Sequence, residues 1–173
     1  HPHRVTKLVE YSWTMGSPMT RVPMMMRLGS PAPMKAVMVR MPISPRAVKI
    51  MLKQVGLKRA IDSGAFDDAM LAWMVALMKH TETFKSETEN NPSISLRGEN
   101  PEVLFTDEEL RRINVPVLLL WGEEDTIAGA AEADAFASRL PQATLDVVRE
   151  AGHAPWIDQL EHCVVKTREF LVA

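Results

Sequence analysis

The chain has 173 residues, 46% of them hydrophobic and 24% charged, a composition typical of one globular domain or of most of one. Its formal net charge of −2 and its pI near 6.2 argue against a nucleic-acid partner, because such proteins present a basic surface. The longest nearly unbroken apolar run, from Ala69 to Met78, has half of the ~20 residues that a membrane-spanning helix needs. We therefore expect no nucleic-acid partner, no membrane contact, and a small molecule as the ligand.

A single cysteine, Cys163, excludes an internal disulfide. Its apolar neighbours, Leu160, Val164 and Phe170, predict a buried core thiol in a reducing, cytoplasmic protein. The opening residues, "HPHRVTKLVEY", contain neither an initiator methionine nor a basic and then apolar leader. We expect that the chain starts inside a longer protein and carries no secretory signal.

The first part of the chain combines one strand signal with a methionine-rich region. Residues 5–11, "VTKLVEY", suggest a strand, and all 12 methionines lie between Met15 and Met78. Six prolines interrupt residues 16–45, so no long regular element fits there. This stretch predicts short helical pieces and turns.

Two longer helices are predicted next, over residues 45–56 and 66–80. The second is apolar almost all round, so we expect neighbouring elements to cover it on several sides. Polar residues 85–101 indicate a connecting loop, and residues 106–109, "TDEE", form a capping-box pattern before a short helix. The first helix is predicted from apolar residues at helical spacing: Val48, Met51, Leu52 and Val55.

The last third predicts a strand buried on both faces over residues 115–121 and a second strand over residues 143–148, each followed by a helix. Asp158 and Glu161 suggest a capping pair at the start of the final helix. Alternation of strand and helix at this spacing predicts a parallel sheet with right-handed crossovers. The helices are expected to bury Ala133, Phe136, Ala137 and Leu140 after the first strand, and Leu160, Cys163, Val164, Thr167 and Leu171 after the second.

Polar side chains follow both of these strands. In a parallel sheet, functional groups gather beyond the carboxyl ends of the strands, and here Asp125 follows the first strand and His153 the second. An aspartate that accepts from one imidazole nitrogen leaves the other to take a proton from a nucleophile or from water. Asp125 and His153 are therefore candidate catalytic residues, with Glu123 or Glu124 as alternative acids.

The runs "VPVLLLWGEEDTI" and "AGHAPWIDQ" together resemble the C-terminal third of the α/β-hydrolase fold. The likeness is close over residues 105–173 and extends more loosely to the opening strand. It implies an α/β protein, the edge of a parallel sheet with an inserted helical lid. The implied parts are residues 1–14 as a core strand, 15–101 as the lid and a connecting loop, and 102–173 as the late strands and helices.

The same resemblance implies that Asp125 is the acid and His153 the base of a Ser-Asp-His triad. The family's nucleophile elbow, G-x-S-x-G, occurs nowhere in this sequence. We therefore expect the nucleophile and the N-terminal half of the fold to lie upstream. The chain alone is expected to be inactive on esters and poorly soluble, because an isolated sheet edge exposes unpaired backbone.

The implied reaction is hydrolysis of an ester-like bond in a small hydrophobic substrate, without a cofactor and without a metal. Met24 and Met25 in the lid, and Trp156 beyond the histidine, are candidates for substrate contacts, although the methionines equally fit an ordinary core. An upstream aspartate nucleophile, as in haloalkane dehalogenases or epoxide hydrolases, is the main alternative. A carbon–carbon hydrolase, a haloperoxidase and a non-catalytic small-molecule-binding member are the others.

Overall fold

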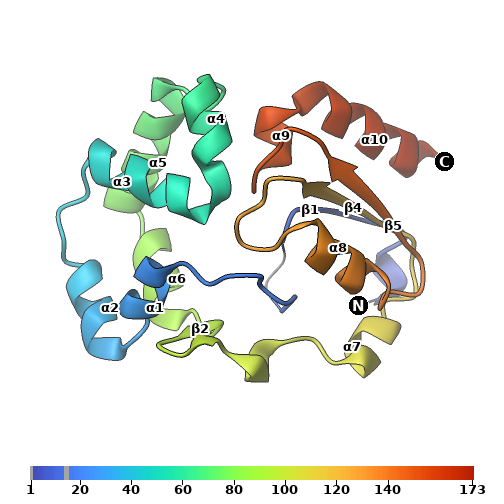
Figure 1. Ribbon diagram of the computed structural model, residues 1–173, viewed down its shortest axis with the longest axis horizontal. Helices are drawn as coiled ribbons and strands as arrows, with labels where there is room; N and C mark the ends of the chain where they lie inside the picture. The colour runs from blue at the N-terminus through green and yellow to red at the C-terminus, as the bar shows by residue number, and fades with distance from the viewer. Residues whose placement is uncertain (1, 14–15) are drawn as a thin grey trace.

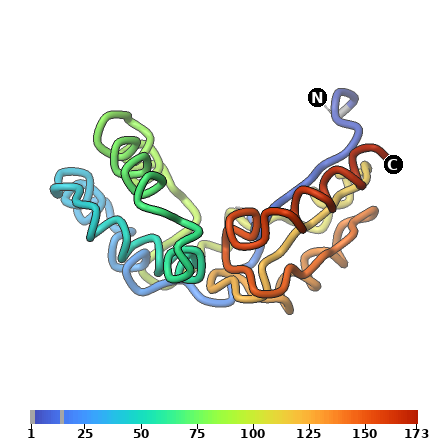
Figure 2. Tube along the Cα trace, turned by 90° about the horizontal axis from the view of Figure 1, so that it is seen from above, coloured from blue at the N-terminus to red at the C-terminus, as the bar shows by residue number. Residues whose placement is uncertain are grey.

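The computed structural model describes residues 2–13 and 16–173. The expected boundary between residues 14 and 15 lies outside the described residues. Within them, the chain forms two parts, a parallel sheet with flanking helices and a group of helices beside it (Figures 1 and 2). The second part, residues 24–90, is called the helical segment below. It lies in the chain between the first and second strands of the parallel sheet.

The parallel sheet has the strand order β1-β4-β5, with β1 at Leu8–Tyr11, β4 at Val117–Gly122 and β5 at Ala143–Val148. Leu8 pairs with Val117 and Val117 with Ala143, so the three strands start in register. All six residues of β4 are buried, as a central strand covered on both faces requires. The predicted parallel sheet is confirmed, although the first strand is shorter than residues 5–11.

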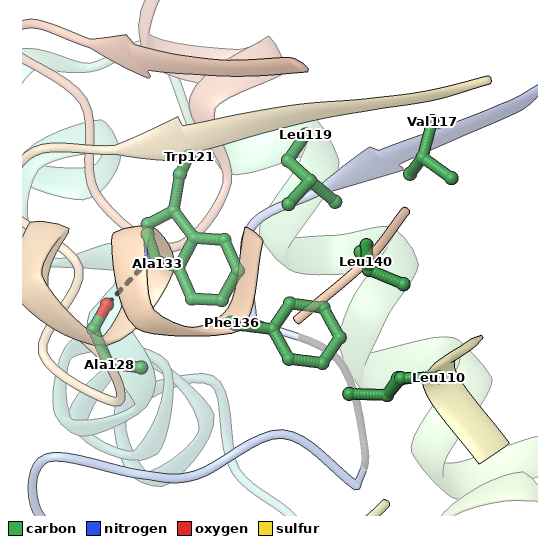
Figure 3. Close-up of a cluster of buried hydrophobic side chains, with 8 residues drawn as sticks. All are labelled: Leu110, Val117, Leu119, Trp121, Ala128, Ala133, Phe136 and Leu140. Carbon is green, nitrogen blue, oxygen red and sulfur yellow. Dashed lines mark hydrogen bonds between the residues drawn. The ribbon is translucent and has the colours of Figure 1, made fainter. Parts of the chain in front are cut away.

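Alternate residues of β4 face two separate cores. Val117, Leu119 and Trp121 pack against α8, Ala130–Ala137, and the indole Nε1 of Trp121 donates to the carbonyl of Ala128 at 2.7 Å (Figure 3). The other face packs against the C-terminal helices α9, Pro155–Asp158, and α10, Leu160–Val172. Both expected cores exist, and the inward residues of α8 are those that the spacing predicted. The buried residues of the first core are Leu110, Val117, Leu119, Trp121, Ala128, Ala133, Phe136 and Leu140.

The expected inward face of the last helix is only partly correct. In α10, Leu160–Val172, Cys163 is buried and the hydroxyl of Thr167 lies 2.5 Å from that of Tyr11 on β1. Leu160, by contrast, is 63% exposed, and Val164 and Leu171 are exposed too. The reason is that β1 is the edge strand of the described sheet, so only a narrow face of α10 packs against a strand.

The helical segment has its own core, formed mainly by α3, α4 and α5. The predicted first helix is confirmed, and its predicted end, Gly56, has a φ of +91° that suits glycine. The expectation that the second helix is covered on several sides is wrong, because Trp73 on α5 is exposed and only Val75 is buried. The elements of the helical segment are α1 Met24–Gly29, α2 Ala32–Met38, α3 Pro45–Leu52, the π-helical turn η2 Lys53–Leu57, α4 Lys58–Ser63, α5 Asp68–His80 and α6 Thr83–Asn90.

The stretch predicted as a loop, residues 85–101, contains regular structure. Its first part belongs to α6, where Lys35 of α2 donates to the carbonyls of Glu89 and Asn91. This helix is polar and is held by contacts with distant residues, so its sequence shows no apolar residues at helical spacing. For that reason the sequence does not predict it. The predicted capping box at Thr106 is confirmed. The remaining elements are η1 Pro2–Arg4, the hairpin β2 Ile94–Ser95 and β3 Gly98–Glu99, η3 Pro101–Val103, α7 Asp107–Arg111 and α9 Pro155–Asp158.

Candidate active site

Asp125 lies in the loop that leaves the carboxyl end of β4, and its side chain is fully buried. One carboxylate oxygen, Oδ1, accepts the backbone N–H of Ile127 at 2.8 Å. The other, Oδ2, lies 2.9 Å from Nδ1 of His153. Both oxygens therefore have partners, which fixes the orientation of the carboxyl group and offsets the cost of its burial.

His153 follows β5, the strand next to β4, so the parallel register brings it to the same sheet edge as Asp125. A carboxylate can only accept hydrogen bonds, so Nδ1 is the donor of this pair, and in the neutral imidazole this leaves Nε2 with its lone pair. The side chain of His153 is 24% exposed, so the ring is not sealed from solvent. This is the arrangement of an oriented general base.

Two glycines allow the two loops to approach each other closely. A Cβ on Gly122 would lie 2.0 Å from the carbonyl oxygen of Gly152, and a Cβ on Gly152 would lie 2.4 Å from that of Gly56. Such distances exclude any side chain at either position, so here the glycines are needed for close backbone contact. Backbone hydrogen bonds join the same loops, from Glu123 N to Val148 O at 2.9 Å and from Glu124 N to Ala151 O at 2.8 Å.

The alternative acids point elsewhere. The carboxylate of Glu124 pairs with Arg59 of α4 at 2.8 Å, and that of Glu123 lies 3.4 Å from the backbone N–H of Glu150. Among the candidate acids, Asp125 is thus the one that the structure brings to His153.

Asp158 does not cap the final helix, which corrects the predicted pairing with Glu161. Its Oδ2 accepts the backbone N–H of Gly152 at 2.9 Å, and α10 starts after Gln159 without a side-chain cap. Burial raises the pKa of the Asp158 carboxyl above its ordinary value, and the hydrogen bond from Gly152 opposes that shift. Asp158 therefore supports the backbone directly before His153.

The chain is similar to known proteins in part of its sequence and in its fold. No family model matches the chain. Over 69 residues, or 39% of this chain and 23% of the relative, it is 38% identical to carboxylesterase YbfK of Bacillus subtilis. The crystal structure of carboxylesterase CesB (YbfK) from Bacillus subtilis aligns with a TM-score of 0.68 at 22% identity over 98% of this chain. A serine hydrolase from Cycloclasticus zankles aligns with a TM-score of 0.65 at 18% identity over 99% of this chain.

The chain has the α/β-hydrolase fold. It spans 52% and 56% of the two solved hydrolases, and 23% of the curated relative. Its strands β1, β4 and β5 with their flanking helices thus represent part of an α/β-hydrolase sheet. Asp125 and His153 follow two neighbouring strands of that sheet.

The predicted substrate-contact residues of this hydrolase fold lie in different places. Met25 of α1 lines a largely apolar cavity of about 590 Å³ in the helical segment, whereas Met24, on the same helix, is exposed and lies outside the lining. Trp156 of α9 lies apart from that cavity and packs edge-on against Tyr11, with ring centroids 5.6 Å apart. Six methionines line the cavity: Met25, Met26, Met38, Met51, Met74 and Met78.

The sequence does not predict that two residues of the helical segment, Gly56 and Arg59, lie near the site. The carbonyl of Gly56 accepts the backbone N–H of His153 at 3.0 Å, and Arg59 pairs with Glu124 and Glu150. Gly56 was recognised only as a helix end, because nothing in a single sequence reveals which distant residue a turn contacts.

Two other kinds of feature are absent from the described ranges, 2–13 and 16–173. These residues contain no group of three or more His, Cys, Asp or Glu side chains placed to hold a metal ion. None of the helices described there is both long and apolar enough to cross a membrane.

Proposed function

We propose that this chain is the C-terminal part of a hydrolase that cleaves an ester-like bond through a Ser-Asp-His triad. Asp125 serves as the acid and His153 as the general base. The observation that carries this proposal is the 2.9 Å contact between Asp125 Oδ2 and His153 Nδ1 at the carboxyl ends of adjacent parallel strands. Similarity to a carboxylesterase and to a serine hydrolase supports the choice of chemistry.

The proposed mechanism assigns each proton to a named atom. Nε2 of His153 takes the proton of a serine hydroxyl as the serine oxygen attacks the ester carbonyl carbon. The bond from that carbon to the leaving oxygen then breaks, and Nε2 returns the proton to the departing alcohol. Water repeats the same steps on the acyl-enzyme and releases the acid. Asp125 stays ionised throughout and stabilises the imidazolium through Nδ1.

The serine belongs, in this proposal, to the part of the fold that the chain does not span. The chain covers about half of the solved hydrolases, and G-x-S-x-G is absent from its sequence. One edge of β1 is unpaired within the described residues, and Leu8, the first residue of this strand, is exposed. We expect this edge to receive further strands of the same fold, which are the partner predicted from the sequence.

The substrate is proposed to be small and hydrophobic. Support comes from the methionine-lined cavity, because thioether side chains adapt to apolar groups of varied shape. Val55 lines this cavity and directly precedes Gly56, whose carbonyl accepts the backbone N–H of His153. His153 and Asp125 themselves are not among the lining residues. Met25 keeps its predicted role in this proposal, whereas Met24 and Trp156 are not part of the cavity wall.

The first prediction tests the triad in the full-length protein with p-nitrophenyl esters of increasing acyl length. Asp125→Asn should lower kcat by roughly 10³- to 10⁴-fold, because the orientation and tautomer of His153 are lost. The matched control is Asp146→Asn, which removes the carboxylate of a second, surface His–Asp pair, with His162 at 3.1 Å. That control should keep kcat within about twofold, since surface pairs contribute little.

A fluorophosphonate probe that modifies activated serines separates the alternatives. Labelling that requires His153 supports the serine triad. Ester turnover by Asp125→Asn equal to that of Asp146→Asn would contradict it. Turnover of haloalkanes or epoxides without serine labelling would point to the aspartate nucleophile, and saturable binding of esters without turnover to a binding protein.

A further inference from the structure

The helical segment contacts the loop of His153 through the turn at residues 55–59. In Figure 1, α4, which begins in this turn, is the helix of the segment nearest to α9, which follows His153. The carbonyl oxygen of Gly56 accepts the backbone N–H of His153 at 3.0 Å. A Cβ built on Gly56 would lie 2.5 Å from the Cβ of His153 and 3.3 Å from Oγ1 of Thr126, the residue after Asp125. The turn therefore lies directly against His153 and against Thr126, the residue that follows Asp125.

Side chains on both sides of this contact strengthen it. Arg59 of α4 binds Glu124 at 2.8 Å and Glu150 at 3.3 Å, so one guanidinium group joins the loop of Asp125 to the loop of His153. In the other direction, Ile157 of α9 packs into the core of the helical segment. The loops of the site are thus held on one side by the sheet and on the other by the helical segment.

We propose that Gly56 is a positioning residue for His153, with Arg59 as its support. This inference rests on the proposed function, because it assigns a role relative to the general base. The hydrogen bond from His153 N to Gly56 O fixes the backbone from which the imidazole extends, and the missing Cβ lets the turn approach to contact distance. A displacement of His153 by a fraction of an ångström weakens its alignment with Asp125 and with the nucleophile.

The chain offers a matched control, Gly64. Both glycines have a left-handed backbone, with φ of +91° at Gly56 and +81° at Gly64, and both end helical turns of the same segment. An added Cβ on Gly64, however, meets nothing within 4 Å. Alanine at either position has the same kind of backbone strain, and only alanine at Gly56 collides with His153.

The second prediction compares Gly56→Ala with Gly64→Ala in the full-length protein. Gly56→Ala should lower kcat by about 10- to 100-fold and leave KM within about threefold, while Gly64→Ala leaves both within about twofold. Imidazole ¹⁵N signals give a second readout, because they report which nitrogen carries the proton. For His153 they should show the Nδ1–H form in the wild type and in Gly64→Ala, and an altered distribution in Gly56→Ala.

Equal kcat values and equal His153 signals in the two variants would overturn the proposal and leave Gly56 with a purely structural role. If the wild-type protein cleaves no ester, the proposed function fails, and the His153 signals still decide whether Gly56 positions the ring. If Gly56→Ala does not fold, Gly56→Asn against Gly64→Asn replaces it. Asparagine tolerates the left-handed backbone and still brings the Cβ against His153.

Discussion

The neighbouring atoms of several residues in this protein explain which side chain each position can hold and how reactive that side chain is. Gly122 and Gly152 have no side chain because the backbone of another loop occupies the space where a Cβ would be. Asp125 and Cys163 are both buried. The carboxylate of Asp125 has hydrogen-bond partners at both oxygens, whereas Cys163 packs among apolar side chains. Burial thus gives one group an oriented charge and leaves the other inert.

The third prediction concerns the reactivity of Cys163. Burial is the main cause that raises the pKa of its thiol, to about 11, and the nearby charge of Asp146 adds to the shift. The thiolate is the reactive form, so a pKa raised from 9.0 to about 11 means about 100-fold less thiolate at pH 8. Cys163 is the only cysteine in the chain, so modification by a disulfide reagent measures it directly.

In the full-length protein, the peptide that contains Cys163 should be modified slowly in the folded state and fast in guanidinium chloride. A folded-state rate within about tenfold of the denatured rate would show that the thiol is accessible and would contradict the burial described for α10.

Elements in this fold follow their local sequence closely where one face is buried or where a cap is present. The alternate residues of β4 separate into two cores, as its unbroken apolar run requires. Helix α7 starts at a capping box in which Thr106 and Glu109 bind each other's backbone N–H. By contrast, α6 has neither an apolar face nor a side-chain cap, and its position depends on distant contacts.

The fourth prediction is that Thr106→Ala destabilises the full-length protein by about 1 kcal/mol, because the N–H of Glu109 loses its acceptor. Thr106→Ser is the control, since it keeps the hydroxyl and should retain most of the stability. Urea unfolding measures both variants. Equal free energies of unfolding for Thr106→Ala and the wild type would mean that the cap contributes nothing to the folded state.

In the molecule as a whole, the sheet part and the helical segment lie side by side and meet where α4 contacts α9 (Figures 1 and 2). Beside the outer strand β1, a surface groove is lined by residues of β1, by Trp156 and by residues of α10, including Leu160 and Val164. An apolar groove beside an unpaired strand edge is unfavourable in water. We expect the rest of the hydrolase fold to cover it.

The fifth prediction compares two neighbouring residues of α10 in the full-length protein. Val164 lines that groove and is 54% exposed, whereas Val165 lies outside it and is 45% exposed. Val164→Lys should lower the free energy of unfolding by more than about 1 kcal/mol, because it buries an unpaired charge, and Val165→Lys should change it by less than about 0.5 kcal/mol. Equal effects in thermal or urea unfolding would mean that the groove stays open to solvent.

The elements whose signals are local could be predicted from the sequence. The buried strand β4, the second strand β5, the capping box, the helix end at Gly56 and the placement of Asp125 and His153 after adjacent strands all follow from periodicity, turn chemistry and motif order. Each of these depends on residues within a few positions of one another. The rule that parallel strands end at one edge placed His153 near the acids of the other loop, and the resemblance to α/β-hydrolases singled out Asp125. The structure pairs Asp125 with His153, whereas Glu123 and Glu124 have other partners.

Only the tertiary structure decided which distant surfaces meet. It brought Gly56 and Arg59 to the loops of the site, made Asp158 a partner of Gly152, and left Leu160 exposed. The physical reason is that a contact between residues far apart in the chain depends on the packing of whole elements, and residue type and local spacing carry no record of that packing.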